Sequence, residues 1–305
     1  MHLECRRIGS IGMQAMPPTS RIQMNGRAAL EAWLKEKGLR YERFERISTR
    51  ADVSGRLALK VVLDDGAQIK ARWLADEDQA TAWHALRMQI GSMAAFSDCL
   101  HREGRMVVEE WVKGETLPMM NPTEDILKRA AETLAEIHCL EIGPRETLST
   151  RAELQRADSR IHSLVLHGSI PPSAANALRE ALQANPPAET KQGLAHADFC
   201  GENLVRHPSR GIVSIDHEWM RVGSLEFDLG RALCRWGLMG PAASAFVAAY
   251  NDAGGPASSE ALPWWLLAND ILASEVRVRH GWADAPTTVS RLLSRIERSS
   301  AHDDF

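Results

Sequence analysis

The segment from residue 193 to residue 228 limits the fold and chemistry of this 305-residue chain more than any other stretch. It contains three side chains with oxygen atoms suited to bind a metal ion or a proton, namely Asp198, Asn203 and Asp216. Residues 204–206 and 212–215 are mostly apolar and β-branched, which is typical of strands, and the sequence His-Pro-Ser-Arg-Gly between them indicates a turn. The segment is therefore expected to fold as a hairpin.

The geometry of this hairpin predicts where the three side chains lie. A hairpin folded symmetrically about Ser209 pairs Asn203 with Ile215, so that Asn203 and Asp216 lie side by side at its open end. Asp198 precedes Asn203 by five residues, on the loop that leads to the same end. Mg²⁺ accepts carboxylate and amide oxygens as ligands, and a further carboxylate can take a proton from a hydroxyl group. The three side chains are thus predicted to converge on one site.

The composition argues against several classes of protein. The formal net charge is −4 at pH 7, so the chain lacks the basic surface expected of a nucleic-acid-binding protein. No apolar run is long enough to span a bilayer, and no membrane association is expected. The five cysteines are widely spaced and form no CxxC motif, so we interpret them as reduced thiols of a cytoplasmic protein.

Three sequence motifs resemble those of one enzyme family. They occur in the order His196-x-Asp198-x4-Asn203, Ile215-Asp216-x-Glu218 and Phe227-Asp228-Leu229. This set is similar to the catalytic and metal-binding motifs of the aminoglycoside phosphotransferase and choline kinase family, a branch of the protein-kinase-like fold. The family usually has Gly where this chain has Ala197, and often Trp or Phe where it has His217. The ordered set is more specific than any one of the motifs.

The resemblance implies an α+β, bilobal protein-kinase-like fold, with a small N-terminal lobe built on an antiparallel sheet and a larger, mainly helical C-terminal lobe. The sequence agrees, since strand patterns and one helix come first and mostly helices follow. We expect a flexible N-terminal extension over residues 1–25, an N-terminal lobe over 26–112 and a C-terminal lobe over 113–305. A ligand is expected in the cleft between the lobes.

Periodicity and turn residues predict the main elements. In the N-terminal lobe we expect a helix from about Arg27 to Lys37 and another from about Asp76 to Ile90. The expected strands of this lobe cover residues 41–47, 56–63, 67–74 and about 105–112. The expected helices of the C-terminal lobe cover residues 125–140, 151–167, 172–184, 229–236, 241–251, 263–280 and 285–299.

The resemblance also implies a set of residues that bind the nucleotide. Lys70 lies on the third expected strand, where the family carries the lysine that contacts the α- and β-phosphates, and Arg72 faces the same way and is a rival. The loop that begins at Ser48 occupies the position of the loop covering the ATP phosphates, but its single Gly also fits an ordinary hairpin loop. Trp111 and Val112 fall in the expected hinge and would flank the adenine, although Trp111 equally fits a core position.

The glutamate that holds this lysine in kinase-like proteins has no clear equivalent. Alignment of the second helix places it near Ala82, which cannot form an ion pair. The nearest acid is Glu77, which also fits the first turn of the helix, where acids favour the helix dipole. The ion pair between lysine and glutamate is therefore left open.

The remaining roles follow from the same resemblance. Asp198 would be the base or orienting group for the attacking hydroxyl, and Asn203 and Asp216 would bind Mg²⁺. His196 would hold the catalytic loop by hydrogen bonds, and Asp228 would brace this loop as a buried acid.

Two further residues keep alternative interpretations. Glu218 would face the metal or the acceptor, or be an ordinary surface acid. Cys200 with His196 could form a nucleophile and base, but no further orienting group is evident, and the spacing His-x3-Cys matches no common zinc site.

The resemblance implies an ATP- and Mg²⁺-dependent kinase that phosphorylates a hydroxyl group of a small molecule, such as an aminoglycoside, choline or another amino alcohol, or a sugar. The acids Glu218, Asp270 and Glu275 would suit a cationic acceptor. The alternative is a kinase-like pseudoenzyme that binds a nucleotide or a protein partner without turnover. The Gly-poor phosphate loop favours this alternative, and the intact catalytic and metal motifs argue against it.

Overall fold

The computed structural model describes residues 18–47, 57–143 and 147–301. These residues belong to two compact units, the first within Met1–His84 and Cys99–Trp111, the second within Ala85–Asp98 and Val112–Phe305. The predicted lobe boundary between residues 112 and 113 stays a prediction. The expected phosphate loop, with Ser48, lies outside the described residues.

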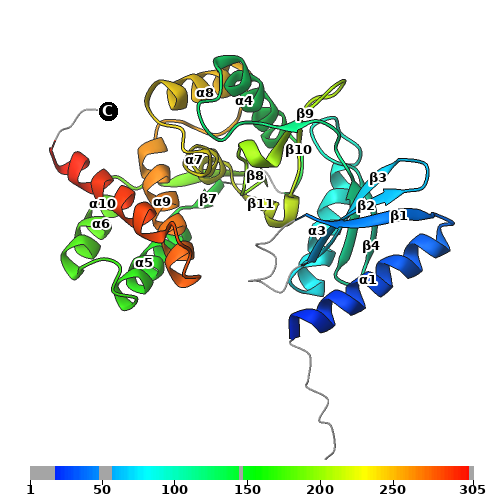
Figure 1. Ribbon diagram of the computed structural model, residues 1–305. Helices are drawn as coiled ribbons and strands as arrows, with labels where there is room; N and C mark the ends of the chain where they lie inside the picture. The colour runs from blue at the N-terminus through cyan, green and yellow to red at the C-terminus, as the bar shows by residue number, and fades with distance from the viewer. Residues whose placement is uncertain (1–17, 48–56, 144–146, 302–305) are drawn as a thin grey trace, which may run out of the picture. The chain divides into compact units, whose positions relative to one another are not determined.

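The first unit is built on an antiparallel sheet of five strands in the order β1-β2-β3-β5-β4 (Figure 1). Its strands are β1 (Tyr41–Arg46), β2 (Leu57–Leu63), β3 (Gln68–Trp73), β4 (Cys99–Glu103) and β5 (Met106–Glu110). The turn between β2 and β3 is stabilised by the Asp65 carboxylate, which accepts a hydrogen bond of 2.9 Å from the Ala67 amide, and Gly66 adopts a positive φ of 81°. The hairpin expected at this Asp-Asp-Gly sequence is confirmed.

Helices cover both faces of this sheet. Leu30, Trp33 and Leu34 of α1 (Pro18–Glu36) pack against the odd-numbered apolar residues of β2 and β3, whereas Ala80 and Trp83 of α3 (Glu77–Ile90) pack with Leu74 and Val107 on the other face. Successive side chains of a strand point to opposite faces. The even-numbered residues of β3 therefore lie on the α3 side of the sheet.

The first helix is longer than predicted. It begins at Pro18, well before the expected start near Arg27. The expected extension over residues 1–25 stays a prediction. Proline suits the first turn of a helix because its missing N–H has no partner to lose there. Apolar periodicity, which guided the prediction, does not detect such a helical start.

The second unit is mainly helical and has two apolar cores. The first core joins α4 (Glu124–His138), α7 (Leu225–Trp236) and α8 (Gly240–Asp252) with the segment around residues 194–212. The second joins α5 (Arg151–Leu166), α6 (Pro172–Ala184), α9 (Leu262–Arg279) and α10 (Ala285–Ala301). Figure 1 shows α4 beside α8, and α5, α6, α9 and α10 gathered as a group. Trp264 and Trp265 of α9 are buried core residues.

Two small sheets position the loops of this unit. One has the order β10-β9-β6 and consists of β6 (Glu115–Thr116), β9 (Leu204–His207) and β10 (Gly211–Ser214). The other has the order β11-β8-β7 and consists of β7 (Thr147–Ser149), β8 (Glu189–Ala195) and β11 (Arg221–Ser224). Sequence patterns missed β4, β6, β7, β8 and β11, because these strands are short or polar. The predicted α+β class is nevertheless confirmed, and none of the helices in the described part of the chain is long and apolar enough to cross a membrane.

Candidate active site

The β9–β10 hairpin has the predicted register. Ser214 pairs with Leu204, and the Ile215 amide donates a hydrogen bond of 2.9 Å to the Asn203 carbonyl oxygen. Asn203 ends a 3₁₀ turn before β9, and Asp216 follows β10. The prediction that Asn203 lies opposite Ile215 is therefore confirmed, and Asp216 comes next along the chain at the same end of the hairpin.

Asp216 has a left-handed backbone conformation, with φ 62° and ψ 51°. Aspartate tolerates this region better than most residues that have a β-carbon. A second 3₁₀ turn, His217–Trp219, follows at once. Glu218 within this turn and Asp216 just before it are both half-buried. The chain thus turns sharply where the second motif ends.

Asp198 and Asn203 are in direct contact. The Asn203 amide nitrogen donates to the Asp198 carbonyl oxygen at 2.8 Å and to Asp198 Oδ2 at 2.9 Å. These two bonds orient the amide of Asn203 so that its Oδ1 is the atom left for another partner. The structure therefore brings together the first two residues of the predicted triad.

Two arginines that sequence reasoning missed lie beside Asp198. Arg235 Nε is 2.9 Å from Asp198 Oδ1, and Arg231 Nη2 is 3.7 Å from the same oxygen. Arg235 also bonds to Glu202 at 2.6 Å. Burial alone would lower the pKa of Arg235, but Asp198 and Glu202 raise it, and the net shift is upward. The two arginines are four residues apart on α7 and so share one helix face, a spacing that could have revealed them.

Asp228 is completely buried and holds the backbone of the His-x-Asp motif. Its two carboxylate oxygens accept hydrogen bonds of 2.7 Å from the amides of His196 and Ala197. His138 Nε2 lies 3.0 Å from Asp228 Oδ2. Burial alone would raise the pKa of Asp228, but His138, His196 and the Ala197 amide lower it below its ordinary value. The carboxylate therefore stays ionised and fixes the start of the loop that carries Asp198.

His138 is held between Asp228 and Tyr250. Its Nδ1 lies 2.7 Å from the Tyr250 hydroxyl, which also accepts a hydrogen bond of 2.9 Å from the Ala257 amide. Because His138 Nε2 faces the Asp228 carboxylate, we infer that this nitrogen carries the proton and that Nδ1 accepts from Tyr250. Burial raises the pKa of Tyr250, so its hydroxyl stays protonated and can donate.

A second buried hydrogen-bond chain supports the loop. His196 Nδ1 accepts from the Asp198 amide at 3.3 Å, so the neutral ring carries its proton on Nε2, which lies 2.7 Å from the Ser214 hydroxyl. Ser214 Oγ is 3.0 Å from His217 Nε2. Burial lowers the pKa of His196, which keeps the ring neutral. His217 also packs edge-to-face against Phe96 with ring centroids 5.0 Å apart, so it fills the aromatic position of the second motif.

Cys200 lacks the properties of a nucleophile. Its side chain is completely buried, and burial raises the pKa of the thiol to about 12. No group of three or more His, Cys, Asp or Glu side chains in the described part of the chain is arranged to hold a metal ion. The soft-ligand alternatives at His196 and Cys200 therefore find no support in the structure.

In the first unit, Lys70 lies on the α3 side of the sheet. Its direct neighbours in the register are Lys60 on β2 and Glu109 on β5. Arg72, the rival, is buried, forms an ion pair of 2.9 Å with Glu109 and lies 5.2 Å from the centre of the Trp83 ring. Arg72 is thus packed into the sheet, whereas Lys70 is half-buried.

The acid nearest to Lys70 in the register is not the one that sequence singled out. Glu77 pairs with Arg102 at 3.7 Å and its side chain is 70% exposed, whereas Glu109 is 1% exposed and directly opposite Lys70. Cross-strand neighbours share a face of the sheet. Glu109 forms its ion pair with Arg72, so the ion pair between lysine and glutamate stays a prediction.

The two expected hinge residues have different surroundings. Trp111 is half-buried, and Lys60 Nζ lies 4.7 Å from the centre of its ring. Val112 is buried and packs with Val205 and Val213 of the hairpin in the second unit.

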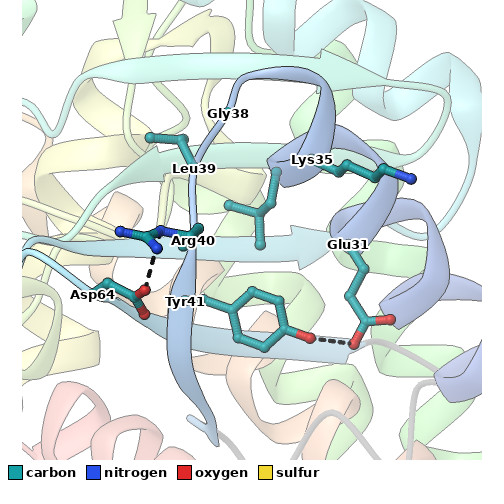
Figure 2. Close-up of a pocket in the computed structure, with 8 residues that line it drawn as sticks. Glu31, Lys35, Gly38, Leu39, Arg40, Tyr41 and Asp64 are labelled. Atoms are coloured by element: carbon teal, nitrogen blue, oxygen red, sulfur yellow. Dashed lines mark hydrogen bonds and ion pairs between the residues drawn. The ribbon is translucent and has the colours of Figure 1, made fainter.

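The first unit also has a surface cavity, of about 480 Å³, next to α1 and β1 (Figure 2). Tyr41 donates a hydrogen bond of 2.9 Å to Glu31, and Arg40 lies 3.5 Å from Asp64. Figure 2 shows both pairs at the edge of the cavity. Both acids that line this cavity are already paired with other lining residues, so neither carboxylate is left to bind a ligand.

Comparison with known proteins identifies the family. Residues 42–265, which are more than half of the chain, match the model of the phosphotransferase enzyme family. The chain belongs to this family. The match spans both units and includes all three motifs of the central segment. Among curated proteins, none has a significantly matching sequence.

Solved structures with the fold of this phosphotransferase family include proteins from distant organisms. Choline kinase LicA from Streptococcus pneumoniae has a TM-score of 0.66 and 15% identity, over 88% of this chain and 99% of that one. Macrolide 2′-phosphotransferase MphH from Brachybacterium faecium has a TM-score of 0.60 and 16% identity, over 87% and 97%. Plasmodium vivax ethanolamine kinase has a TM-score of 0.60 and 12% identity, over 83% and 81%. At such low identity these likenesses show the protein-kinase-like fold alone.

Proposed function

We propose that this phosphotransferase transfers the γ-phosphoryl group of ATP to a hydroxyl group of a small molecule. One observation carries the proposal. Asp198 and Asn203 are hydrogen-bonded to each other at the open end of the hairpin, and Asp216 follows the second strand at the same end. Solved structures of similar fold are described as a choline kinase, an ethanolamine kinase and a macrolide phosphotransferase, and one is LicA in complex with AMP. These descriptions support both the nucleotide and the alcohol acceptor.

The residues at the hairpin end fit Mg²⁺. Asn203 Oδ1 and the Asp216 carboxylate would be its protein ligands, and both are hard oxygen donors. The amide nitrogen of Asn203 is already engaged by Asp198, which fixes the orientation that a metal ligand needs. Bound there, Mg²⁺ would neutralise negative charge on the phosphates. Glu218, near Asp216 and half-buried, is proposed as a supporting acid.

Asp198 is proposed as the group that receives the proton of the acceptor. The acceptor oxygen forms a bond to the γ-phosphorus, the bond from that phosphorus to the bridging oxygen of ADP breaks, and the proton of the hydroxyl passes to Asp198. Arg235 and Asn203 hold one carboxylate oxygen each, so the carboxylate cannot rotate freely. This positioning matters more than base strength, because phosphoryl transfer needs alignment above all.

Three residues are proposed to bind the nucleotide. Lys70 would contact its phosphates, and Trp111 and Val112 would flank the adenine. Arg72 is a weaker candidate, because its guanidinium is buried against Glu109. The Ser48 loop keeps its expected role at the phosphates as a prediction.

The test combines nucleotide binding with turnover. ATP is expected to raise the melting temperature of the protein more with Mg²⁺ than without it, and ATP consumption is expected with at least one alcohol from a panel of hydroxy acids, amino alcohols, sugars and antibiotics. Replacement Asp198→Asn should lower kcat by roughly 10²- to 10⁴-fold while the thermal shift with ATP and Mg²⁺ stays. The control is Asp125→Asn, which changes an exposed acid of α4 paired only with Arg129.

Two outcomes would contradict this proposal. Full activity of the Asp198→Asn enzyme would exclude Asp198 as the proton acceptor. ATP binding that ignores Mg²⁺, together with no turnover on any alcohol, would favour the non-catalytic alternative.

A further inference from the structure

The second unit has a cavity between α5 and α9 with a volume of about 650 Å³, which is the size of a small-molecule site. One face of each helix forms its walls, because the lining residues recur at helical spacing. The polar side chains at the cavity come mainly from α5 and include Gln155, Arg156, Ser159, Arg160 and Ser163. From α9 the cavity is lined by Leu272, Glu275, Val276 and Arg279.

The cavity carries net positive charge, and most of its charged groups are already paired. It is lined by three arginines and one acid. Arg156 bonds to Glu153 with Nε 3.0 Å from Oε2, and Arg279 Nε is 3.5 Å from Glu275 Oε1. Glu275 also accepts a hydrogen bond of 3.3 Å from Ser163. The third arginine, Arg160, forms no such pair with any described residue.

Arg160 is the exception in this cavity. Its Nη1 is shielded from solvent and has no hydrogen-bond partner among the described residues. Burial lowers its pKa below the ordinary value, and the charges of Arg156 and Arg231 lower it further against the opposing effect of Glu153 and Glu275. Arginine nevertheless stays charged in proteins. A buried donor on a charged group without an acceptor is costly, and Arg160 forms no ion pair with a described carboxylate that would offset this cost.

Arg231 connects this cavity with Asp198. Its Nε donates to the Ala197 carbonyl at 3.3 Å, and its Nη2 lies 3.7 Å from Asp198 Oδ1. Arg231 Nη1, like Arg160 Nη1, is shielded from solvent without a partner among the described residues. The charge of Arg231 also acts on Arg160, so positive charge extends from Asp198 towards the cavity.

We propose that the acceptor is an alcohol with an anionic group, a carboxylate or a phosphate, which Arg160 binds in the cavity between α5 and α9. This inference rests on the proposed function, since the hydroxyl of the same molecule would reach Asp198. Arg160 offers a planar pair of donors that matches either oxyanion, and Arg231 stabilises negative charge on the path between them.

The structure also weakens the expectation of a cationic acceptor. Asp270 is buried and is neutralised by Arg291 at 3.1 Å and Arg295 at 2.8 Å. Glu275 is held by Arg279 and Ser163. Two of the three acids on which that expectation depended are thus already paired with arginines.

The first arm of the test measures turnover. ATP consumption is compared for glycerate and glycerol 3-phosphate as anionic alcohols, choline as a cationic one and glycerol as a neutral one. Turnover is expected with an anionic alcohol, and the carboxylate and phosphate probes tell which oxyanion is preferred. Arg160→Gln should lower kcat/KM for that alcohol about 10- to 100-fold, mainly through KM, because one charge-assisted contact is lost. Arg160→Lys should recover part of this loss.

The second arm measures binding without turnover. Calorimetric titration of glycerate and of glycerol 3-phosphate, without ATP, should show binding of one of them that is lost in Arg160→Gln. The control Arg179→Gln changes an arginine of α6 that pairs with Asp158 outside the cavity lining, and it should leave binding unchanged. Unchanged melting temperatures show that the variants are folded.

The possible failures are distinguishable. Turnover with choline or glycerol but with neither anionic alcohol would overturn the anionic acceptor and leave the phosphotransferase function intact. An Arg160→Gln enzyme with an unchanged KM would overturn the role of Arg160. If no alcohol is phosphorylated, the proposed function fails. The titration still decides whether Arg160 binds an anion. The absence of binding there would contradict the inference.

Discussion

Asp228 and Asp198 are carboxylates of the same site that are held in different ways. Asp228 is completely buried and receives its hydrogen bonds from two backbone amides and the ring of His138. Asp198 is half-buried and is held by the side chains of Asn203 and Arg235. Backbone donors cannot leave without local unfolding, whereas side-chain donors can exchange for another partner. The first carboxylate therefore stabilises the loop, whereas the second can change partners, as the proposed proton acceptor must.

The difference between the two carboxylates is tested most strongly by removing the charge of each one in turn. Asp228→Asn should lower the free energy of unfolding by about 3–5 kcal/mol, because one of the buried donors then faces an amide N–H instead of an oxygen. Asp198→Asn should lower it by less, because the Asp198 side chain keeps 16% of its surface exposed and its donors are side chains that can find other partners. Urea denaturation of both variants measures the difference. Equal losses of stability would show that the two carboxylates are not divided in this way.

A pH titration of stability sharpens the same comparison. The pKa of His196 is lowered in the fold, so below about pH 6.5 the unfolded chain binds a proton that the folded chain does not, and stability falls. The pKa of Asp228 is also lowered, so its contribution is present above its unfolded pKa of about 3.9 and is lost as the pH falls through the folded value.

Urea denaturation between pH 7.5 and pH 4 measures this effect. The free energy of unfolding is expected to fall by up to about 1.4 kcal/mol per pH unit for each such proton. The slope between about pH 6.5 and pH 5 should decrease in His196→Gln, and His207→Gln, at the end of β9, is the control variant. A stability that stays flat from pH 7.5 to pH 5 would contradict the neutral, buried state of His196.

The smallest expected effect concerns Ala197, which joins the two carboxylates. Its amide donates to Asp228, it precedes Asp198, and its φ is 65°, a region that glycine adopts freely. Ala197→Gly relieves strain but increases the freedom of the unfolded chain, so the net change in stability should be within about 1 kcal/mol. Ala197→Val should instead destabilise by about 2 kcal/mol. Thermal denaturation checks both, and a valine variant as stable as the wild type would contradict the left-handed conformation.

The sequence predicted well the features that depend on residues near each other in the chain. The Asp-Asp-Gly turn and the register between Asn203 and Ile215 follow from strand pairing, and both are confirmed. The helical C-terminal part also followed from apolar periodicity, although α7 begins at Leu225, before the expected start. These features need only neighbouring residues to form.

Features that depend on distant contacts escaped sequence reasoning. Glu109 could not be placed opposite Lys70 until β3 and β5 were known to be adjacent, because more than thirty residues separate them. Arg231 and Arg235 lie on α7, more than thirty residues after Asp198, and they contact it only in the folded chain. The charge of Asp270 suggested an acceptor site, yet its neutralisation by α10 is visible only after packing. A charged residue in a sequence carries no sign of its partner.

The register of the β9–β10 hairpin has a consequence for how this family can vary. The spacing of Asn203 and Asp216 is set by the pairing of Asn203 with Ile215 at the open end, and not by the length of the turn. Insertions at Ser209 should therefore leave Asn203 and Asp216 at the same end of the hairpin. A single residue inserted within either strand should shift the pairing by one and move one of the two side chains to the opposite face. We expect changes of length to be tolerated at the hairpin tip and not in its arms.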